Sequence, residues 1–132
     1  MPQKEENKKL VMTFFERWEK SADEVSASLK DFIGDECIWR QSGVQDCKGP
    51  EEAIALMRLA REFAGVETIR VDLLNLVAEG DIVISERVDI VKKADGSVIS
   101  ELPVVGVMEI KNGKLCRWSE YFNPSDFKGA EA

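Results

Sequence analysis

The chain has 132 residues, of which 44% are hydrophobic and 33% are charged, and this size and composition predict one soluble globular domain. Eighteen basic and 25 acidic residues give a formal net charge of -7, which disfavours nucleic acid and an anionic membrane surface as partners. The sequence contains no histidine, so this chain alone builds neither a Ser-His-Asp triad nor a histidine metal site.

The start of the chain is not expected to act as a targeting signal. Residues 1–9 are polar with mixed charges, which predicts neither a signal peptide nor a membrane anchor; residues 1–6 are expected to be flexible. Cys37, Cys47 and Cys116 are an odd number at unrelated spacings, a pattern that favours reduced thiols in a cytoplasmic protein. No Gly-rich phosphate loop is present, and no cofactor is expected.

The first half of the chain predicts three helices. Apolar residues recur at helical spacing up to Lys20, and a second helix is expected after Ser21, ended by Gly34. A short strand follows over 37–41. A third helix should start at Gly49-Pro50, since Pro suits the first helical position, and run to about Phe63.

From residue 68 the apolar period changes from helical to alternating. Four strands are predicted, over 68–77, 82–91, 98–110 and 114–122. Asp95-Gly96 and Asn112-Gly113 are typical of hairpin turns, so the last three strands should form an antiparallel meander. The predicted fold is α+β, with three helices packed on a strongly curved mixed or antiparallel sheet. Such a cone-shaped domain encloses an apolar pocket.

Three charged residues fall on strand faces that otherwise look buried. Because residues i and i+2 of a strand point to the same side, Arg87 and Asp89 share a face with Val83, Ser85 and Val91. By the same count, Glu120 is the lone charge on the face of Cys116, Trp118 and Phe122. If both faces line one pocket, the site holds an arginine and two carboxylates in dry surroundings, where acid-base chemistry is feasible.

The order of elements resembles the nuclear transport factor 2-like, or SnoaL-like, superfamily. Within it, three segments are similar to limonene-1,2-epoxide hydrolase: Glu86-Arg-Val-Asp89, Leu102-Pro-Val-Val-Gly-Val-Met-Glu-Ile110 and Gly113-Lys-Leu-Cys-Arg-Trp-Ser-Glu-Tyr-Phe122. The resemblance extends over about residues 10–127 and is specific in the last third. It implies a cofactor-independent hydrolase that adds carboxylate-activated water to an epoxide of a hydrophobic small molecule in one step.

The same resemblance implies a role for each site residue. Arg87 matches the arginine that bridges the two carboxylates, and Asp89 matches the proton donor. Glu120 stands where the family has its water-activating aspartate, and Trp39 and Gln41 stand where it has a tyrosine and an asparagine that hold the water. We expect Asp89 and Glu120 to titrate as a coupled pair. The pocket-lining positions implied by the resemblance are Val91, Leu102, Val104, Met108, Trp118 and Phe122.

Other interpretations remain open from the residues alone. Arg87 and Asp89 also fit a structural ion pair on an exposed edge, Glu120 fits a solvated strand end, and the tryptophans fit a core. An isomerase or cyclase of the same superfamily is an alternative, although Tyr121, the only tyrosine, is predicted to point away from Glu120. A non-catalytic binding or dimerisation module is another. By the resemblance, a homodimer is expected to form through the outer sheet face, which includes Arg117, Ser119 and Tyr121.

Overall fold

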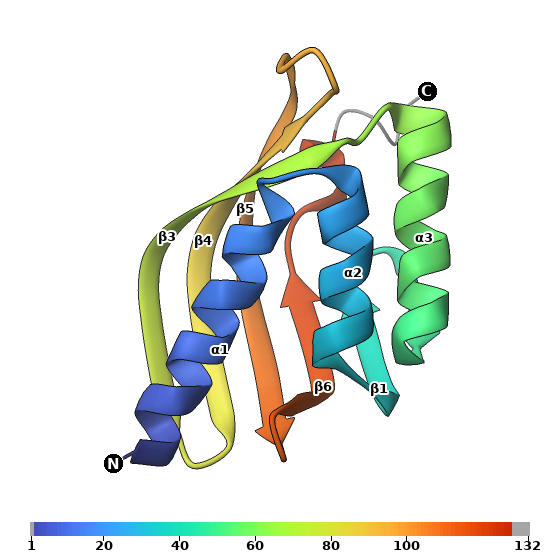
Figure 1. Cartoon of the computed structure of the whole chain (residues 1–132). Helices are drawn as coiled ribbons and strands as arrows, with labels where there is room; N and C mark the ends of the chain where they lie inside the picture. The colour runs from blue at the N-terminus through green and yellow to red at the C-terminus, as the bar shows by residue number, and fades with distance from the viewer. Residues whose placement is uncertain (1, 128–132) are drawn as a thin grey trace.

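Three helices cover one face of a six-stranded sheet (Figure 1). The computed structural model describes residues 2–127. Its elements, in chain order, are α1 (Pro2–Trp18), α2 (Ala22–Phe32), β1 (Ile33–Gln41), β2 (Val44–Lys48), α3 (Gly49–Ala64), β3 (Thr68–Glu79), β4 (Ile82–Lys92), β5 (Val98–Lys111), β6 (Lys114–Tyr121) and a short 3-10 helix, η1 (Pro124–Asp126).

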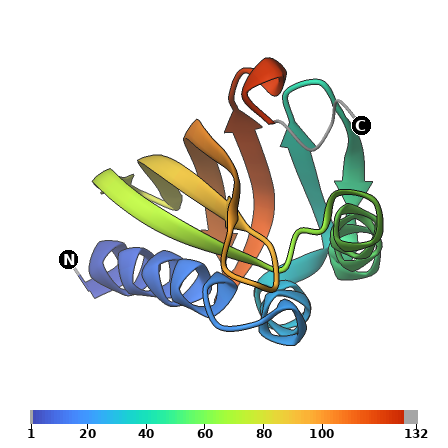
Figure 2. The same ribbon diagram turned by 90° about the horizontal axis from the view of Figure 1, so that it is seen from above.

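The sheet is mixed and strongly curved, and it does not close into a barrel. Its strand order is β2-β1-β6-β5-β4-β3, and the helices lie along its concave side (Figure 2). Strands β3 to β6 form a consecutive antiparallel meander, whereas β1 pairs with β6 in parallel. The predicted α+β architecture is confirmed. The parallel pair matters most for the site, because it brings β1 beside a strand that is remote in sequence.

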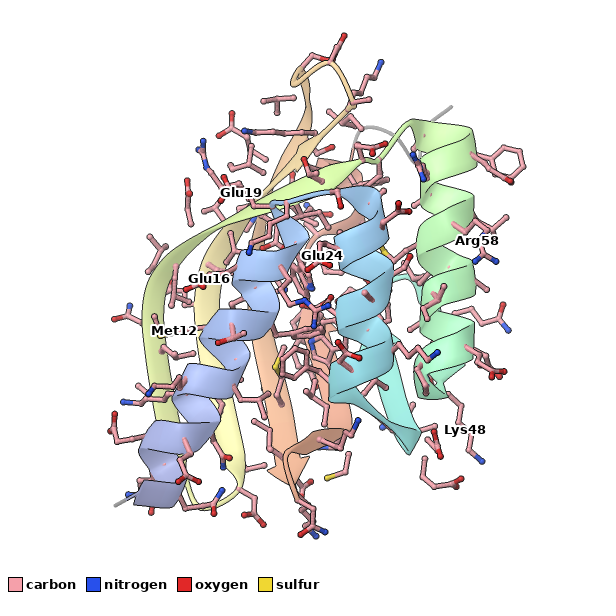
Figure 3. All side chains as sticks on the ribbon, viewed as in Figure 1. Met12, Glu16, Glu19, Glu24, Lys48 and Arg58 are labelled. Atoms are coloured by element: carbon pink, nitrogen blue, oxygen red, sulfur yellow. The ribbon has the colours of Figure 1, made fainter. Side chains whose placement is uncertain are left out.

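The helices bury apolar stripes against the inner sheet face. Ser21 caps α2 by accepting a hydrogen bond from the backbone N–H of Glu24 at 3.0 Å. Met12 and Glu16 lie on the face of α1 turned away from the sheet (Figure 3). Among residues 2–127, no helix is long and apolar enough to cross a membrane. The buried centre of the core combines residues from helices and strands: Val11, Phe14, Leu29, Ile33, Cys37, Ala53, Val83, Met108, Ile110, Leu115 and Trp118.

Helix α1 begins at Pro2, so residues 2–6 lie in its first turns, and their flexibility stays a prediction. One predicted helix end was wrong. Gly34 does not end α2, because the strand already begins at Ile33. This glycine serves a close strand contact instead: a Cβ atom on it would lie 3.0 Å from the carbonyl oxygen of Leu115.

Two features of the strands were not predicted from the sequence pattern. Strand β2 was not predicted, because only Cys47 of its five residues is buried and no apolar alternation marks it. It forms a hairpin with β1 through a turn at Gly43, which has a positive φ of 71°. The second feature is an irregularity where β5 pairs with β6, between Glu109 and Ile110. Leu115 is buried there, whereas Cys116, expected on the inner face, is only half-buried.

Candidate active site

Arg87 joins two carboxylates from neighbouring parts of the sheet. Its Nε donates a hydrogen bond to Oδ1 of Asp89 at 2.8 Å, and its Nη2 donates to Oδ2 of the same residue at 3.2 Å. The same Nη2 also donates to Oε2 of Glu120 on β6. Bidentate pairing of this kind uses the planar fork of the guanidinium and fixes its partners in space. The structure thus brings together the three charged residues that the strand pattern had selected.

The second oxygen of Glu120 is held by an indole. Trp39 Nε1 donates a hydrogen bond to Glu120 Oε1 at 3.1 Å. Strand register explains the contact, because the parallel pairing places Trp39 beside Trp118 and Gln41 beside Glu120. The rings of Trp39 and Trp118 stack with centroids 4.2 Å apart and planes 3° apart. Trp39 has a single N–H donor, and that donor engages the carboxylate rather than pointing to a water site.

Burial shifts the pKa of Asp89 and of Arg87. Arg87 is 1% exposed, Asp89 is 7% exposed and Glu120 is 6% exposed, so none of them is an edge ion pair or a solvated strand end. Burial raises the pKa of Asp89, and the positive charge of Arg87 opposes this rise without cancelling it. For Arg87, burial alone lowers the pKa, but attraction by Glu120 and Asp89 outweighs it and the pKa ends above its ordinary value. Asp89 is therefore suited to hold a proton beside a permanently charged arginine.

Helix α1 covers the guanidinium with two aromatic rings. The Cζ atom of Arg87 lies 4.8 Å from the ring centroid of Phe15 and 5.7 Å from that of Trp18. Such contacts stabilise a desolvated cation through the ring quadrupole. They also exclude water from the ion pairs, which strengthens each electrostatic contact within them. The sequence predicted α1 as a core helix but gave no sign that it covers the charged centre.

Above these charges lies an apolar pocket of about 240 Å³. Asp89, Glu120, Trp39 and Gln41 all line it, whereas Arg87 does not. Of the expected pocket positions, five contribute to the wall: Val91, Leu102, Val104, Trp118 and Phe122. The remaining wall includes residues of α2, α3, the α3–β3 connection and the start of β3: Val25, Leu29, Leu56, Met57, Ala60, Val66 and Ile69.

Met108 was wrongly expected in the pocket. It is 1% exposed and belongs to the core cluster, where it pairs with Val83 on β4 and Trp118 on β6. Along β5, Leu102 and Val104 line the pocket, Gly106 lies in register with Ser85 and Glu120, and Met108 comes next. The Arg87 cluster is thus the floor of the pocket, and Met108 lies in the core on the other side of that floor.

The pocket reaches the surface. Gly43 in the β1–β2 turn, Val44 at the start of β2 and Pro124 in η1 line it and are exposed. The turn is fastened to the site strand, because the backbone N–H of Ser42 donates to the carbonyl oxygen of Glu120 at 3.1 Å. Gln41, at the base of this turn, is half-buried and lines the pocket beside Glu120. The result is a partly open apolar pocket with its titratable groups on the floor.

None of the three cysteines lines the pocket within residues 2–127. Burial raises the pKa of Cys37 to about 12, which suppresses the thiolate that nucleophilic chemistry needs. The lining residues that titrate as acids are Asp89 and Glu120. The arrangement is therefore suited to proton transfer by carboxylates.

Two residues below the floor carry no charge and were not predicted as part of the site. Ser85 accepts a hydrogen bond from Nη1 of Arg87 at 3.0 Å, and Gly106 leaves the space that this nitrogen occupies. A glycine inside a strand often marks a close approach by another group, so Gly106 offered a signal in the sequence. Ser85 offered a weaker one, as a polar residue on the Arg87 face.

Comparison with known proteins places this geometry in a family. The family model described as the limonene-1,2-epoxide hydrolase catalytic domain matches residues 5–130. Epoxide hydrolase EphG from Mycobacterium tuberculosis is 30% identical over 108 residues. That match covers 81% of this chain and 66% of EphG, so the chain spans just under two thirds of the length of this relative.

Solved structures share the fold at lower sequence identity. A limonene-epoxide-hydrolase-like epoxide hydrolase from M. tuberculosis has a TM-score of 0.76 and 23% identity, with 98% of this chain and 87% of that chain covered. A putative SnoaL-like polyketide cyclase from Jannaschia sp. CCS1 has a TM-score of 0.74 and 18% identity, with 97% and 95% covered. The fold is therefore the nuclear transport factor 2-like, or SnoaL-like, fold, and the chain belongs to the limonene-1,2-epoxide hydrolase catalytic domain family.

Proposed function

We propose that this chain adds water to an epoxide carried by a hydrophobic small molecule, in one step and without a cofactor. The observation that carries the proposal is Arg87 hydrogen-bonded to both Asp89 and Glu120 at the floor of an apolar pocket. An epoxide has a single polar group, and such a floor offers that group a proton donor and a base together. The family match and the EphG relative support the same reaction class.

In the proposed reaction, Glu120 is the base and Asp89 is the acid. Glu120 takes a proton from water while the water oxygen bonds to an epoxide carbon. The bond from that carbon to the epoxide oxygen breaks, and Asp89 gives its proton to this oxygen, so the product is a diol. A proton then returns from Glu120 to Asp89 before the next turnover. The raised pKa of Asp89 suits the acid role.

We assign the water to Gln41 and Glu120, and a different role to Trp39. Gln41 lines the pocket and pairs in register with Glu120, and within residues 2–127 its side-chain amide has no hydrogen-bond partner. An amide supplies both a donor and an acceptor for a water. Trp39 orients Glu120 through its N–H, so the indole acts on the base itself rather than on the water.

The test is diol formation from a panel of apolar epoxides, measured by chiral gas chromatography with mass detection. The panel should also contain a β,γ-unsaturated ketone, because the same acid and base suit proton transfer beside a carbonyl. Tyr121 is 59% exposed, which disfavours an isomerase that relies on a tyrosine donor. If the ketone is isomerised and no epoxide yields a diol, the protein is an isomerase and the hydrolase proposal is wrong. Turnover of neither substrate class would favour a binding module.

The protonation of Asp89 gives a pH prediction. Because its pKa is raised in the folded state, the folded protein binds this proton more tightly than the unfolded chain does, so this group's stabilising effect is lost as pH rises through the folded pKa. Catalysis by this acid should decline over the same range. We expect Asp89→Asn to lower kcat by about 10²- to 10⁴-fold and to make unfolding by urea less sensitive to rising pH. An unchanged kcat for Asp89→Asn would remove Asp89 from the acid role.

We also propose that the chain forms a homodimer through the outer face of the sheet. This face carries exposed apolar side chains on β4, β5 and β6, namely Ile84, Val105 and Tyr121. Arg117 is exposed nearby, whereas Ser119 is buried within the sheet surface. Light scattering after size-exclusion chromatography should give twice the chain mass of 14.8 kDa. Val105→Glu should restore the single-chain mass, and a monomeric wild type would contradict the proposal.

A further inference from the structure

Two small residues lie under the guanidinium of Arg87, on the side away from the pocket. Ser85 on β4 and Gly106 on β5 are direct partners in the antiparallel register, and both are buried. Neither lines the pocket, so neither is in a position to touch a substrate. Ser85 accepts a hydrogen bond from Nη1 of Arg87, and Gly106 on the adjacent strand leaves free the space beside the same atom that a Cβ atom would fill.

We propose that Ser85 and Gly106 form a seat that fixes the rotation of the Arg87 guanidinium, and through it the positions of both carboxylates. They are positioning residues, since they act through Arg87. The catalytic consequence of the seat rests on the function proposed above, whereas its effect on Arg87 itself does not.

Ser85 acts on a group of rigid shape, the guanidinium of Arg87. Its three nitrogens lie in one plane with fixed directions for their N–H groups. Nε and Nη2 bind Asp89 and Glu120, and Nη1 donates to Ser85 Oγ at 3.0 Å. An acceptor on Nη1 therefore sets the angle at which the other two nitrogens meet the carboxylates. If the Ser85 hydroxyl is removed, Nη1 loses this acceptor while it stays buried. An unsatisfied buried donor is unfavourable, so the guanidinium lowers its free energy by tilting towards another acceptor.

Gly106 acts by leaving space for the guanidinium of Arg87. A Cβ atom on this residue would lie 2.5 Å from Nη1 of Arg87 and 3.1 Å from Oγ of Ser85. The backbone of Gly106 is outside the positive-φ region, so alanine is acceptable to the main chain and its methyl group is the whole perturbation. Phe15 and Trp18 cover Arg87 from α1. The guanidinium therefore has to move relative to the carboxylates to make room.

The kinetic test compares four variants with the wild type on an epoxide that it converts. We expect Ser85→Ala to lower kcat by about 10- to 100-fold and Gly106→Ala by about 100-fold, because a displacement near 1 Å costs about 10²-fold in rate. KM should change by less than about twofold, since neither residue lines the pocket. Ser85→Thr, which keeps the hydroxyl, should recover most of the kcat lost in Ser85→Ala. Ser28→Ala is the matched control, because Ser28 is a buried serine of α2 that bonds to the Val25 carbonyl.

A second readout does not depend on activity. In protein labelled with ¹⁵N-arginine, a seated guanidinium rotates slowly about its Nε–Cζ bond and gives separate Nη1 and Nη2 signals. The Arg87 signals are assigned by their loss in Arg87→Lys. We expect separate Nη signals in the wild type and in Ser85→Thr, and merged signals in Ser85→Ala. Gly106→Ala should shift both signals.

The two measurements separate the two proposals. Separate Nη signals in Ser85→Ala overturn the seat, even where kcat falls. If the wild type forms no diol but its Nη signals merge in Ser85→Ala, the seat stands and the proposed hydrolase function is wrong. If diol forms and Ser85→Ala equals the wild type in both measurements, the function stands and the seat is wrong.

Discussion

Replacing Glu120 with glutamine is expected to lower kcat for epoxide hydration by about 10³-fold, within the range that a general base contributes. The amide has nearly the shape of the carboxylate but does not accept a proton at neutral pH. It also removes the negative charge that Arg87 faces in the buried cluster. Because Glu120 lies on the floor of the pocket, we expect the loss in kcat rather than in substrate affinity.

A second variant, with a smaller expected effect than Glu120→Gln, tests the role of Trp39. Trp39→Phe keeps an aromatic ring for stacking on Trp118 and removes the N–H that binds Glu120 Oε1. We expect a smaller loss of kcat, about tenfold, because the base remains but is less well fixed. Glu101→Gln, on the exposed side of β5, is the control for loss of one acidic residue. A Glu120→Gln variant as active as this control would exclude Glu120 as the base.

Replacing Arg87 with methionine is expected to abolish turnover and to lower the free energy of unfolding by about 3–5 kcal/mol. Removal of one partner from a buried ion pair leaves the other charge without compensation. Here Glu120 loses its counter-charge and Asp89 loses two hydrogen-bond donors. The Arg87 side chain is fully buried, so water does not replace the lost hydrogen bonds. Urea unfolding at neutral pH measures the change.

The matched control for this variant is Arg58→Met. Arg58 lies on the outer side of α3 (Figure 3) and is exposed, so its loss should change stability by less than about 0.5 kcal/mol. Arg87→Lys separates charge from geometry, because lysine keeps the positive charge but lacks the planar fork. Compared with Arg87→Met, Arg87→Lys should recover part of the lost free energy of unfolding but little of the lost kcat. Equal stability of Arg87→Met and the wild type would contradict the buried cluster described above.

Strand periodicity selected the charged residues that meet, and the resemblance assigned them to one site. The i and i+2 rule put Arg87, Asp89 and Glu120 on inward faces, and tight turns between the last strands predicted the meander that aligns those faces. Charges on an apolar face are costly unless they find partners. Their occurrence on two strands of one meander therefore indicated that they pair with one another.

Other features depend on quantities that the pattern does not contain. Periodicity gives the face of a residue but not its depth, and the resemblance did not supply that depth for Met108, which was expected in the pocket and lies in the core. The contact of Trp39 with Glu120 depends on the parallel register of β1 and β6, which nothing local in either strand specifies. Strand β2 lacks an apolar face, so no period marked it.

A single-turnover reaction in H₂¹⁸O, with enzyme in excess over an apolar epoxide, distinguishes attack on the epoxide by water from attack by a carboxylate. If Glu120 activates water for direct attack, the diol from the first turnover carries one ¹⁸O, and peptides containing Asp89 and Glu120 carry none. Unlabelled first-turnover diol, with ¹⁸O later found in one of these carboxylates, would show that a carboxylate attacks the epoxide itself. That result would contradict one-step hydration by activated water.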